Sequence, residues 1–224
     1  MGLIGVVKCL NQEGELCTKF PSDDLKLGSQ IVVYPSQVAF FVKGGAICDE
    51  FTSGTYTIET ENIPILNKLI NLPFGDQSPF KAEVWYVSQL AKLDFKWGTI
   101  IPLQIEDPKY HIIVPIRANG QYGIKVTNPR AFLECFIGNQ ESLSSSRIEQ
   151  YFRSLILSKL ISSIAKKILF NQISVLDINI YLDEISHYCR ESINPSFQKY
   201  GLDIIEFNII SINLPDNDSS VQTL

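Results

Sequence analysis

The sequence predicts an α+β fold in which a mostly antiparallel, hairpin-rich sheet packs with C-terminal helices and a closing strand. Three observations lead to this prediction. Strand-sized apolar runs separated by turn residues fill residues 30–127. A long amphipathic helical pattern begins at Arg147, and a strand-like apolar run returns at residues 202–212. Strands and helices do not alternate along the chain, which disfavours a doubly wound parallel sheet.

The first half of the chain reads as a series of strands. Apolar runs predict strands at residues 31–34, 38–43, 46–51, 56–59, 82–88 and 92–97. Pro35-Ser36, Gly44-Gly45 and Ser53-Gly54-Thr55 supply turns between them. Residues 38–42 are apolar throughout, which predicts a strand covered on both faces. A short helical segment is expected at residues 62–72.

The densest turn and cap signals come next in the chain. Asp107-Pro108 predicts a turn. Asn119-Gly120 predicts a type I′ hairpin, because both central positions of that turn need a positive φ. Asn128-Pro129 then predicts the start of a helix over residues 130–137, which Gly138 closes.

The last third of the chain is mainly helical. Ser144-Ser145-Ser146 offers caps for a long amphipathic helix over residues 147–170. Its apolar face is predicted to contain Leu157, Leu160, Ile161, Ile164 and Ile168. A second helix is expected at residues 180–193, with Asn194-Pro195 at its end, and residues 202–212 form the closing strand.

Changes in composition divide the chain into four parts. They are an N-terminal arm (residues 1–27), a β-rich subdomain (28–140), a helical subdomain with the closing strand (141–215) and a disordered tail (216–224). For the arm, an edge strand or a docked terminus is favoured over a membrane contact, because its apolar run is short.

Composition disfavours several classes of protein. The 224 residues are 45% hydrophobic and 19% charged, as in an ordinary globular protein with one large or two small domains. A formal net charge of −5 disfavours a dedicated nucleic-acid role. No run approaches the ~20 apolar residues of a membrane-spanning helix, and the N-terminus lacks a signal peptide. Val6 stands where a myristoylation signal has Ser or Thr.

The cysteines indicate a reducing, cytoplasmic compartment. Five of them are scattered without a Cys-x-x-Cys pair, and only two histidines accompany them, which argues against zinc and disulfides. Cys48, Cys135 and Cys189 lie in apolar or amphipathic stretches and are expected to be small buried hydrophobes.

No motif for catalysis or cofactor binding is visible. The sequence lacks a phosphate loop, a nucleophile elbow and a paired metal motif. His111 and His187 are interpreted as structural or surface histidines. The carboxylates of Asp23-Asp24 and of Asp183-Glu184 are expected to point apart. Four aromatic residues are interpreted as core rather than as a base-stacking surface: Trp85, Tyr86, Phe95 and Trp97. We therefore expect no catalytic residue, no cofactor and no metal.

Several short motifs, in a fixed order along the chain, resemble those of a known family. They are Val38 to Gly45, Gly54-Thr55-Tyr56, Thr60 to Pro64, Trp97 to Pro102, Asn119 to Tyr122, Asn128 to Leu133 with Gly138, Tyr200-Gly201-Leu202 and Leu214-Pro215. With these motifs the chain resembles the SPFH or band 7 family, whose members include stomatins, prohibitins and flotillins. It is most similar to a bacterial branch of soluble, virion core protein-like members. The resemblance covers roughly residues 28–215.

The resemblance implies a non-enzymatic scaffold that self-associates and recruits partner proteins at the cytoplasmic face of a membrane. Family members assemble laterally, usually through a coiled coil after the final strand. Bacterial relatives help to recruit membrane-remodelling, phage-shock-type proteins during envelope stress. Longer relatives also carry a C-terminal zinc ribbon, and neither the coiled coil nor the ribbon is visible in these 224 residues.

Two alternative functions remain open. One is a peripheral membrane-binding module that uses the N-terminal apolar run and the basic helix. Its candidate membrane contacts are Leu3, Ile4, Val6, Val7, Arg147, Arg153, Lys159, Lys166 and Lys167. For the helix, packing against the sheet with solvated lysines is favoured over membrane contact. The other alternative is a hydrolase or small-ligand protein with a pocket between sheet and helices.

Overall fold

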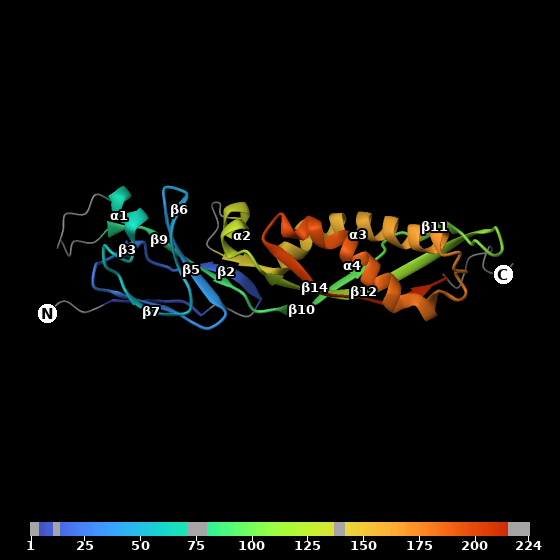
Figure 1. The fold of residues 1–224 in the computed structure, drawn as a ribbon, viewed down its shortest axis with the longest axis horizontal. Helices are drawn as coiled ribbons and strands as arrows, with labels where there is room; N and C mark the ends of the chain where they lie inside the picture. Colours follow the sequence, from blue (N-terminus) through green and yellow to red (C-terminus); the bar gives the residue numbers. More distant parts are fainter. Residues whose placement is uncertain (1–4, 11–13, 71–79, 137–141, 215–224) are drawn as a thin grey trace. The chain divides into compact units, whose positions relative to one another are not determined.

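The computed structural model describes residues 5–10, 14–70, 80–136 and 142–214. It contains two compact units, which are described separately below (Figure 1). Unit 1 comprises residues 1–90 and 126–148, and unit 2 comprises residues 91–125 and 149–224. The predicted α+β class with mostly antiparallel strand pairs is confirmed. The units cut across the predicted subdomain boundaries after residues 27 and 140.

The main sheet of unit 1 has five antiparallel strands in the order β13-β2-β9-β5-β6. They are β13 (Ser142–Ser144), β2 (Glu15–Lys19), β9 (Glu83–Ser88), β5 (Gln37–Lys43) and β6 (Ala46–Phe51). The predicted burial of residues 38–42 is confirmed, since all five side chains are at most 4% exposed. Gly44 and Gly45 have φ values of 58° and 78°, so the predicted two-residue turn joins β5 to β6.

Smaller sheets and two short helices complete unit 1. β1 (Val6–Lys8), β4 (Gln30–Val33) and β7 (Gly54–Thr57) form a three-stranded sheet, and β3 (Asp24–Leu25) pairs with β8 (Phe80–Lys81). The helices are α1 (Pro64–Ile70) and α2 (Pro129–Phe136). The described part of the predicted N-terminal arm is therefore integrated, since β1, β2 and β3 each pair with a strand from elsewhere in the unit.

The sheet of unit 2 is organised around β12 (Ile113–Val126), which pairs with three strands. β10 (Lys92–Gly98) and β11 (Leu103–Glu106) pair antiparallel with it, and β14 (Leu202–Asn213) also pairs with it. Figure 1 shows α3 (Ser145–Phe170) and α4 (Leu182–Gln198) running alongside these strands. A 3₁₀ turn, η1 (Ile178–Tyr181), precedes α4.

The predicted hairpin at Asn119-Gly120 is wrong. Both residues lie inside β12, a continuous strand of 14 residues, and neither has a positive φ. The chain turns instead after Asp107-Pro108, between β11 and β12. Gly120 faces Trp97 across the strand pair, and a Cβ atom there would lie 2.7 Å from the indole ring. Glycine is therefore needed at position 120 because neighbouring groups approach closely, and not because the chain turns there.

The buried apolar side chains of α3 recur at every fourth residue. They are Ile148, Phe152, Ile156, Leu160, Ile164 and Ile168. The predicted apolar face is correct for Leu160, Ile164 and Ile168, but Ile161 is 38% exposed and Leu157 is half-buried. A helix has 3.6 residues per turn, so a four-residue repeat advances around the helix by about 40° per step. Leu157 and Ile161 each come one residue after a member of this row and lie to one side of it.

Helix α4 continues past the predicted stop and covers the edge of β14. Pro195 lies inside the helix, whose last turn contains the fully buried Phe197. Ser186 Oγ accepts a hydrogen bond from the N–H of Ile209, and Asn194 Oδ1 accepts one from the N–H of Ile204. Arg190 donates to the carbonyl of Ile204. Side chains spaced four residues apart on α4 thus satisfy backbone groups of the strand.

Asn128 caps the start of α2, as predicted. Asn128 Oδ1 accepts a hydrogen bond of 3.0 Å from the N–H of Ala131. Replacing Asn128 by alanine leaves that donor to solvent and should lower the free energy of unfolding by about 1 kcal/mol. Urea unfolding followed by circular dichroism would measure the change. Asn128→Ser retains a capping oxygen, so an equal loss in both variants would contradict a capping role.

Candidate interaction surface

The N-terminal membrane-contact candidates are placed differently from one another. Leu3 and Ile4 lie outside the described residues. Val6 is 49% exposed, whereas Val7 is 4% exposed and belongs to the apolar core of unit 1. Among the candidates that the structure describes at this end, Val6 alone presents its side chain to solvent.

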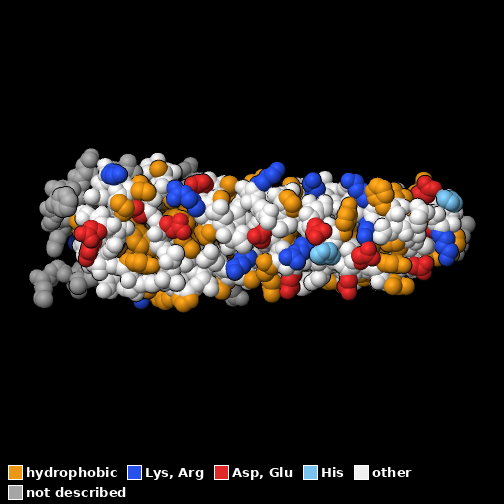
Figure 2. Space-filling view, viewed as in Figure 1, with side chains coloured by type: hydrophobic (Ala, Val, Ile, Leu, Met, Phe, Trp, Pro, Cys, Tyr) orange, Lys and Arg blue, Asp and Glu red, His pale blue; other side chains and the backbone are white. Residues whose placement is uncertain are grey.

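The basic candidates on α3 are exposed with one exception. Arg147, Arg153, Lys159 and Lys166 are all exposed. Lys167 is not, because its Nζ lies 2.7 Å from the carboxylate of Glu184 and 5.6 Å from the centre of the Tyr188 ring. Lys167 therefore ties α3 to α4 within unit 2. Figure 2 shows Lys and Arg side chains spaced along the edge of the molecule that α3 forms.

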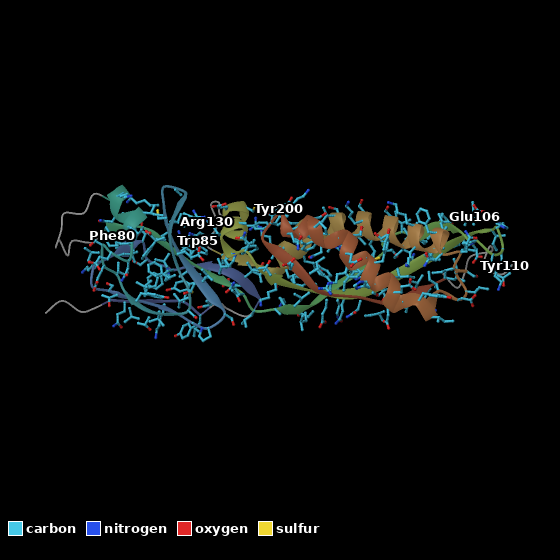
Figure 3. All side chains as sticks on the ribbon, in the orientation of Figure 1. Phe80, Trp85, Glu106, Tyr110, Arg130 and Tyr200 are labelled. Atoms are coloured by element: carbon cyan, nitrogen blue, oxygen red, sulfur yellow. The ribbon has the colours of Figure 1, made fainter. Side chains whose placement is uncertain are left out.

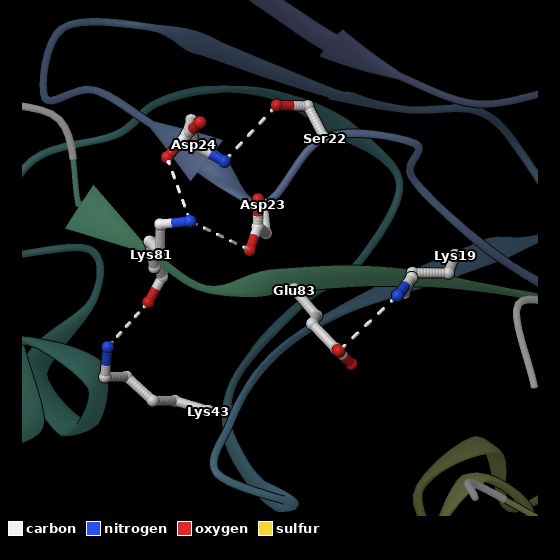
Figure 4. A network of polar contacts seen from close by, with 7 residues as sticks. All are labelled: Lys19, Ser22, Asp23, Asp24, Lys43, Lys81 and Glu83. Carbon is white, nitrogen blue, oxygen red and sulfur yellow. Dashed lines mark hydrogen bonds and ion pairs between the residues drawn. The ribbon is translucent and has the colours of Figure 1, made fainter. Parts of the chain in front are cut away.

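Unit 1 carries a network of paired charges on its surface (Figure 4). Lys81 Nζ lies 3.7 Å from Asp23 and 3.9 Å from Asp24, and Lys43 Nζ donates to the carbonyl of Lys81. Lys19 and Glu83 form a further pair at 3.5 Å. A groove of about 450 Å³ runs beside several of these residues. The carboxylates of Asp23 and Asp24 both reach Lys81, so the expectation that they point apart is wrong, and the lysine is their common ion-pair partner.

The histidines pair with surface carboxylates. His111 Nδ1 lies 3.3 Å from Glu106, and His187 Nε2 lies 3.3 Å from Glu191. All four side chains are more than half exposed. Ser186 lines the same groove of about 390 Å³ as His187. Its hydroxyl oxygen accepts a hydrogen bond from the backbone N–H of Ile209 in β14. These contacts support the interpretation of both histidines as surface residues.

Between the sheet and α3 of unit 2 lies a niche lined by Trp97, Tyr122, Glu149, Arg153 and others. Its volume is about 10 Å³, which accommodates one water molecule and not an organic substrate. This place therefore does not provide the pocket that a hydrolase or small-ligand protein needs.

Asp107 is a buried carboxylate that joins two loops at one end of unit 2. It is fully buried and accepts hydrogen bonds from the N–H groups of Lys109, Tyr110 and Val175 and from the hydroxyl of Ser174, at 2.7–3.1 Å. Burial alone would raise the pKa of Asp107, but these four donors lower it below its usual value of 3.8. Figure 3 shows Glu106 and Tyr110, which flank this loop, at the same end of the unit.

Most of the chain matches a known protein family. The sequence profile of the SPFH domain–Band 7 family matches residues 18–222. The chain belongs to the SPFH domain–Band 7 family. It is 28% identical over 200 residues to the uncharacterized protein YdjI of Bacillus subtilis (strain 168), an alignment that covers 88% of this chain and 60% of YdjI. Among the helices that the structure describes, none is both long and apolar enough to cross a membrane.

The cysteines of this SPFH domain are free thiols. Cys48 and Cys189 are buried as predicted, but Cys135 on α2 is exposed. Cys17 on β2 is buried, and burial raises the pKa of Cys17 and Cys189 to about 12. No group of three potential metal ligands occurs among the residues described.

The four aromatic residues predicted as core of the SPFH domain are buried. Their exposed fractions are 2% for Trp85, 0% for Tyr86, 3% for Phe95 and 8% for Trp97. Trp85 and Tyr86 belong to unit 1, and Phe95 and Trp97 belong to unit 2. Asp107 is the residue whose role sequence reasoning missed, because Asp-Pro signals only a turn.

Proposed function

We propose that this chain is a non-enzymatic SPFH scaffold that self-associates and recruits partner proteins at the cytoplasmic face of a membrane. The observation that carries the proposal is the family match over residues 18–222. Exposed cations on α3 also favour a role in binding over one in catalysis.

The partners are proposed from the resemblance described above. They are a second copy of the chain and membrane-remodelling, phage-shock-type proteins that act in an envelope-stress response. The chain spans about 60% of the length of its relative YdjI. From the resemblance described above, we propose that strong self-association depends on a coiled coil that follows the SPFH domain.

Light scattering over a concentration series tests self-association of the chain. The monomer mass is 25.3 kDa, and we expect the measured mass to rise above it with increasing concentration. A mass that stays at the monomer value throughout the series would contradict self-association by these residues.

A peripheral membrane-binding module is the second candidate, favoured by the exposed side chains of Val6, Arg153, Lys159 and Lys166. We expect sedimentation with phosphatidylglycerol vesicles at low salt and none with phosphatidylcholine vesicles, because lysine and arginine are attracted to an anionic surface. High salt should release the protein. Failure to sediment with anionic vesicles at low salt would exclude direct membrane contact by this chain.

A further inference from the structure

The indole N–H of Trp97 in β10 is a buried hydrogen-bond donor without an acceptor among the residues that the structure describes. The side chain is only 8% exposed, and its ring stacks on Phe207 with centroids 5.5 Å apart. Native proteins pair the large majority of buried polar groups with a protein group or an ordered water molecule. Trp97 therefore requires an acceptor that the described protein groups do not supply.

The second tryptophan of the chain shows the usual arrangement. Trp85 is 2% exposed, and its Nε1 donates a hydrogen bond of 2.9 Å to Oε2 of Glu83. The two indoles are thus similarly buried, but only Trp85 has a side-chain acceptor. Trp85 therefore serves as an internal reference for Trp97.

Trp97 lines the small niche between the sheet and α3 of unit 2. Tyr122 of β12 and Glu149 of α3 contribute a hydroxyl and a carboxylate to the same niche. Burial raises the pKa of the Tyr122 hydroxyl, and the negative charge of Glu149 raises it further. The other lining residues are Lys96, Gly98, Arg153, Ile156 and Leu157. An unpaired donor and an acceptor thus line one niche, from opposite sides of the contact between sheet and helix.

We propose that a single ordered water molecule occupies this niche and connects Trp97 of β10 to Glu149 of α3. The water accepts a hydrogen bond from the indole N–H and donates one to the Glu149 carboxylate. Its second hydrogen goes to the hydroxyl oxygen of Tyr122. The volume of about 10 Å³ holds about one water molecule, and three partners are typical of a buried water. The water site is independent of the proposed scaffold role.

Other occupants fit the niche less well. A cation is disfavoured because the indole N–H only donates and would point its proton at a positive charge. An anion would lie close to the Glu149 carboxylate and be repelled by it. An organic molecule exceeds the volume of about 10 Å³. Water both accepts and donates hydrogen bonds, so it satisfies Trp97 and Glu149 together.

NMR spectroscopy of the full chain tests the proposal through the indole protons. The chain contains two tryptophans, so two indole signals are expected, each assigned through bonds to its own backbone amide. We expect the Trp97 indole proton to show nuclear Overhauser effects to water with opposite signs in the laboratory and rotating frames. Opposite signs indicate a long-lived water, whereas chemical exchange of the proton gives the same sign in both. Trp85 should lack this signal, because Glu83 accepts its hydrogen bond.

Variants of Glu149 test the connection to α3. Glu149→Met keeps a side chain of similar size but removes the acceptor, so the water signal at Trp97 should be lost. Glu149→Gln keeps a carbonyl oxygen and should retain the signal. Glu191→Met makes the same change in charge at an exposed position of α4 and should also retain it. Circular dichroism would verify that each variant is folded.

Each remaining outcome would overturn the proposal. Absence of a water signal at Trp97 in the unmodified chain would exclude an ordered water at this site. An equal signal at Trp85 would show that hydration is not specific to the niche. Retention of the signal in Glu149→Met, or its loss in Glu191→Met as well, would contradict a connection through Glu149. A crystal structure in which the Trp97 indole donates to a protein oxygen would replace the water with that acceptor.

Discussion

Replacing Gly120 by alanine should lower the free energy of unfolding by about 3 kcal/mol, the range typical of severe steric defects. A Cβ atom at this position would fall on the carbonyl oxygen of Asn208 and 2.7 Å from the Trp97 ring. Trp97 stacks on Phe207 with ring centroids 5.5 Å apart, and β14 contributes both Phe207 and Asn208. The methyl group therefore forces β10, β12 and β14 apart at the middle of the sheet of unit 2.

Gly98 supplies a matched control for this prediction. It lies in β10, and a Cβ atom there would meet its nearest neighbour at an ordinary distance of 3.7 Å. Gly98→Ala should therefore leave stability unchanged within about 0.5 kcal/mol or raise it slightly, since alanine restricts the unfolded chain. Urea unfolding followed by circular dichroism would compare the two variants. Equal stability of the Gly120 and Gly98 variants would show that the sheet accommodates a side chain at position 120.

Replacing Asp107 by asparagine should lower the free energy of unfolding by about 2–3 kcal/mol at neutral pH. The carboxylate accepts four hydrogen bonds, including one from Ser174 and one from Val175. Asparagine turns one accepting oxygen into a donor, which then faces N–H or O–H groups in a buried site. Asp107→Ala should lower the free energy of unfolding by at least as much, because all four donors lose their acceptor.

The effect of Asp107 should depend on pH in a defined direction. Its pKa is lowered in the folded protein, so the stability that it contributes is present above its usual pKa of 3.8 and is lost as pH falls through the lowered value. The difference between the unmodified chain and Asp107→Asn should be constant near neutral pH and shrink on acidification below about pH 4. Asp94, whose side chain is 73% exposed, gives the control Asp94→Asn. A pH-independent difference for Asp107→Asn would contradict the lowered pKa.

Local signals predicted much of the fold. The buried run of β5, the turn at Gly44-Gly45 and the cap at Asn128 appear in the structure where they were expected. Each depends on a few neighbouring residues: an unbroken apolar run, two glycines with positive φ, or one side-chain oxygen at a helix start.

Features that depend on distant residues were not predictable from the sequence. Asn119-Gly120 has the composition of a hairpin turn, but the reason for Gly120 is an indole in one strand and a carbonyl in another. The role of Asp107 depends on Ser174 and Val175, more than 60 residues later. The buried row of α3 follows the surface that it packs on, so periodicity alone placed Ile161 on the wrong side. In each case tertiary packing overrode a local preference.

The side chains of α4 also decide what the edge of β14 can bind. The backbone groups of Ile204 and Ile209 are satisfied by Ser186, Arg190 and Asn194. Unpaired backbone groups at the edge of a sheet would otherwise offer a template for a strand of another chain. At these positions β14 is therefore closed to strand addition, and another chain that approached this edge would meet side chains of α4.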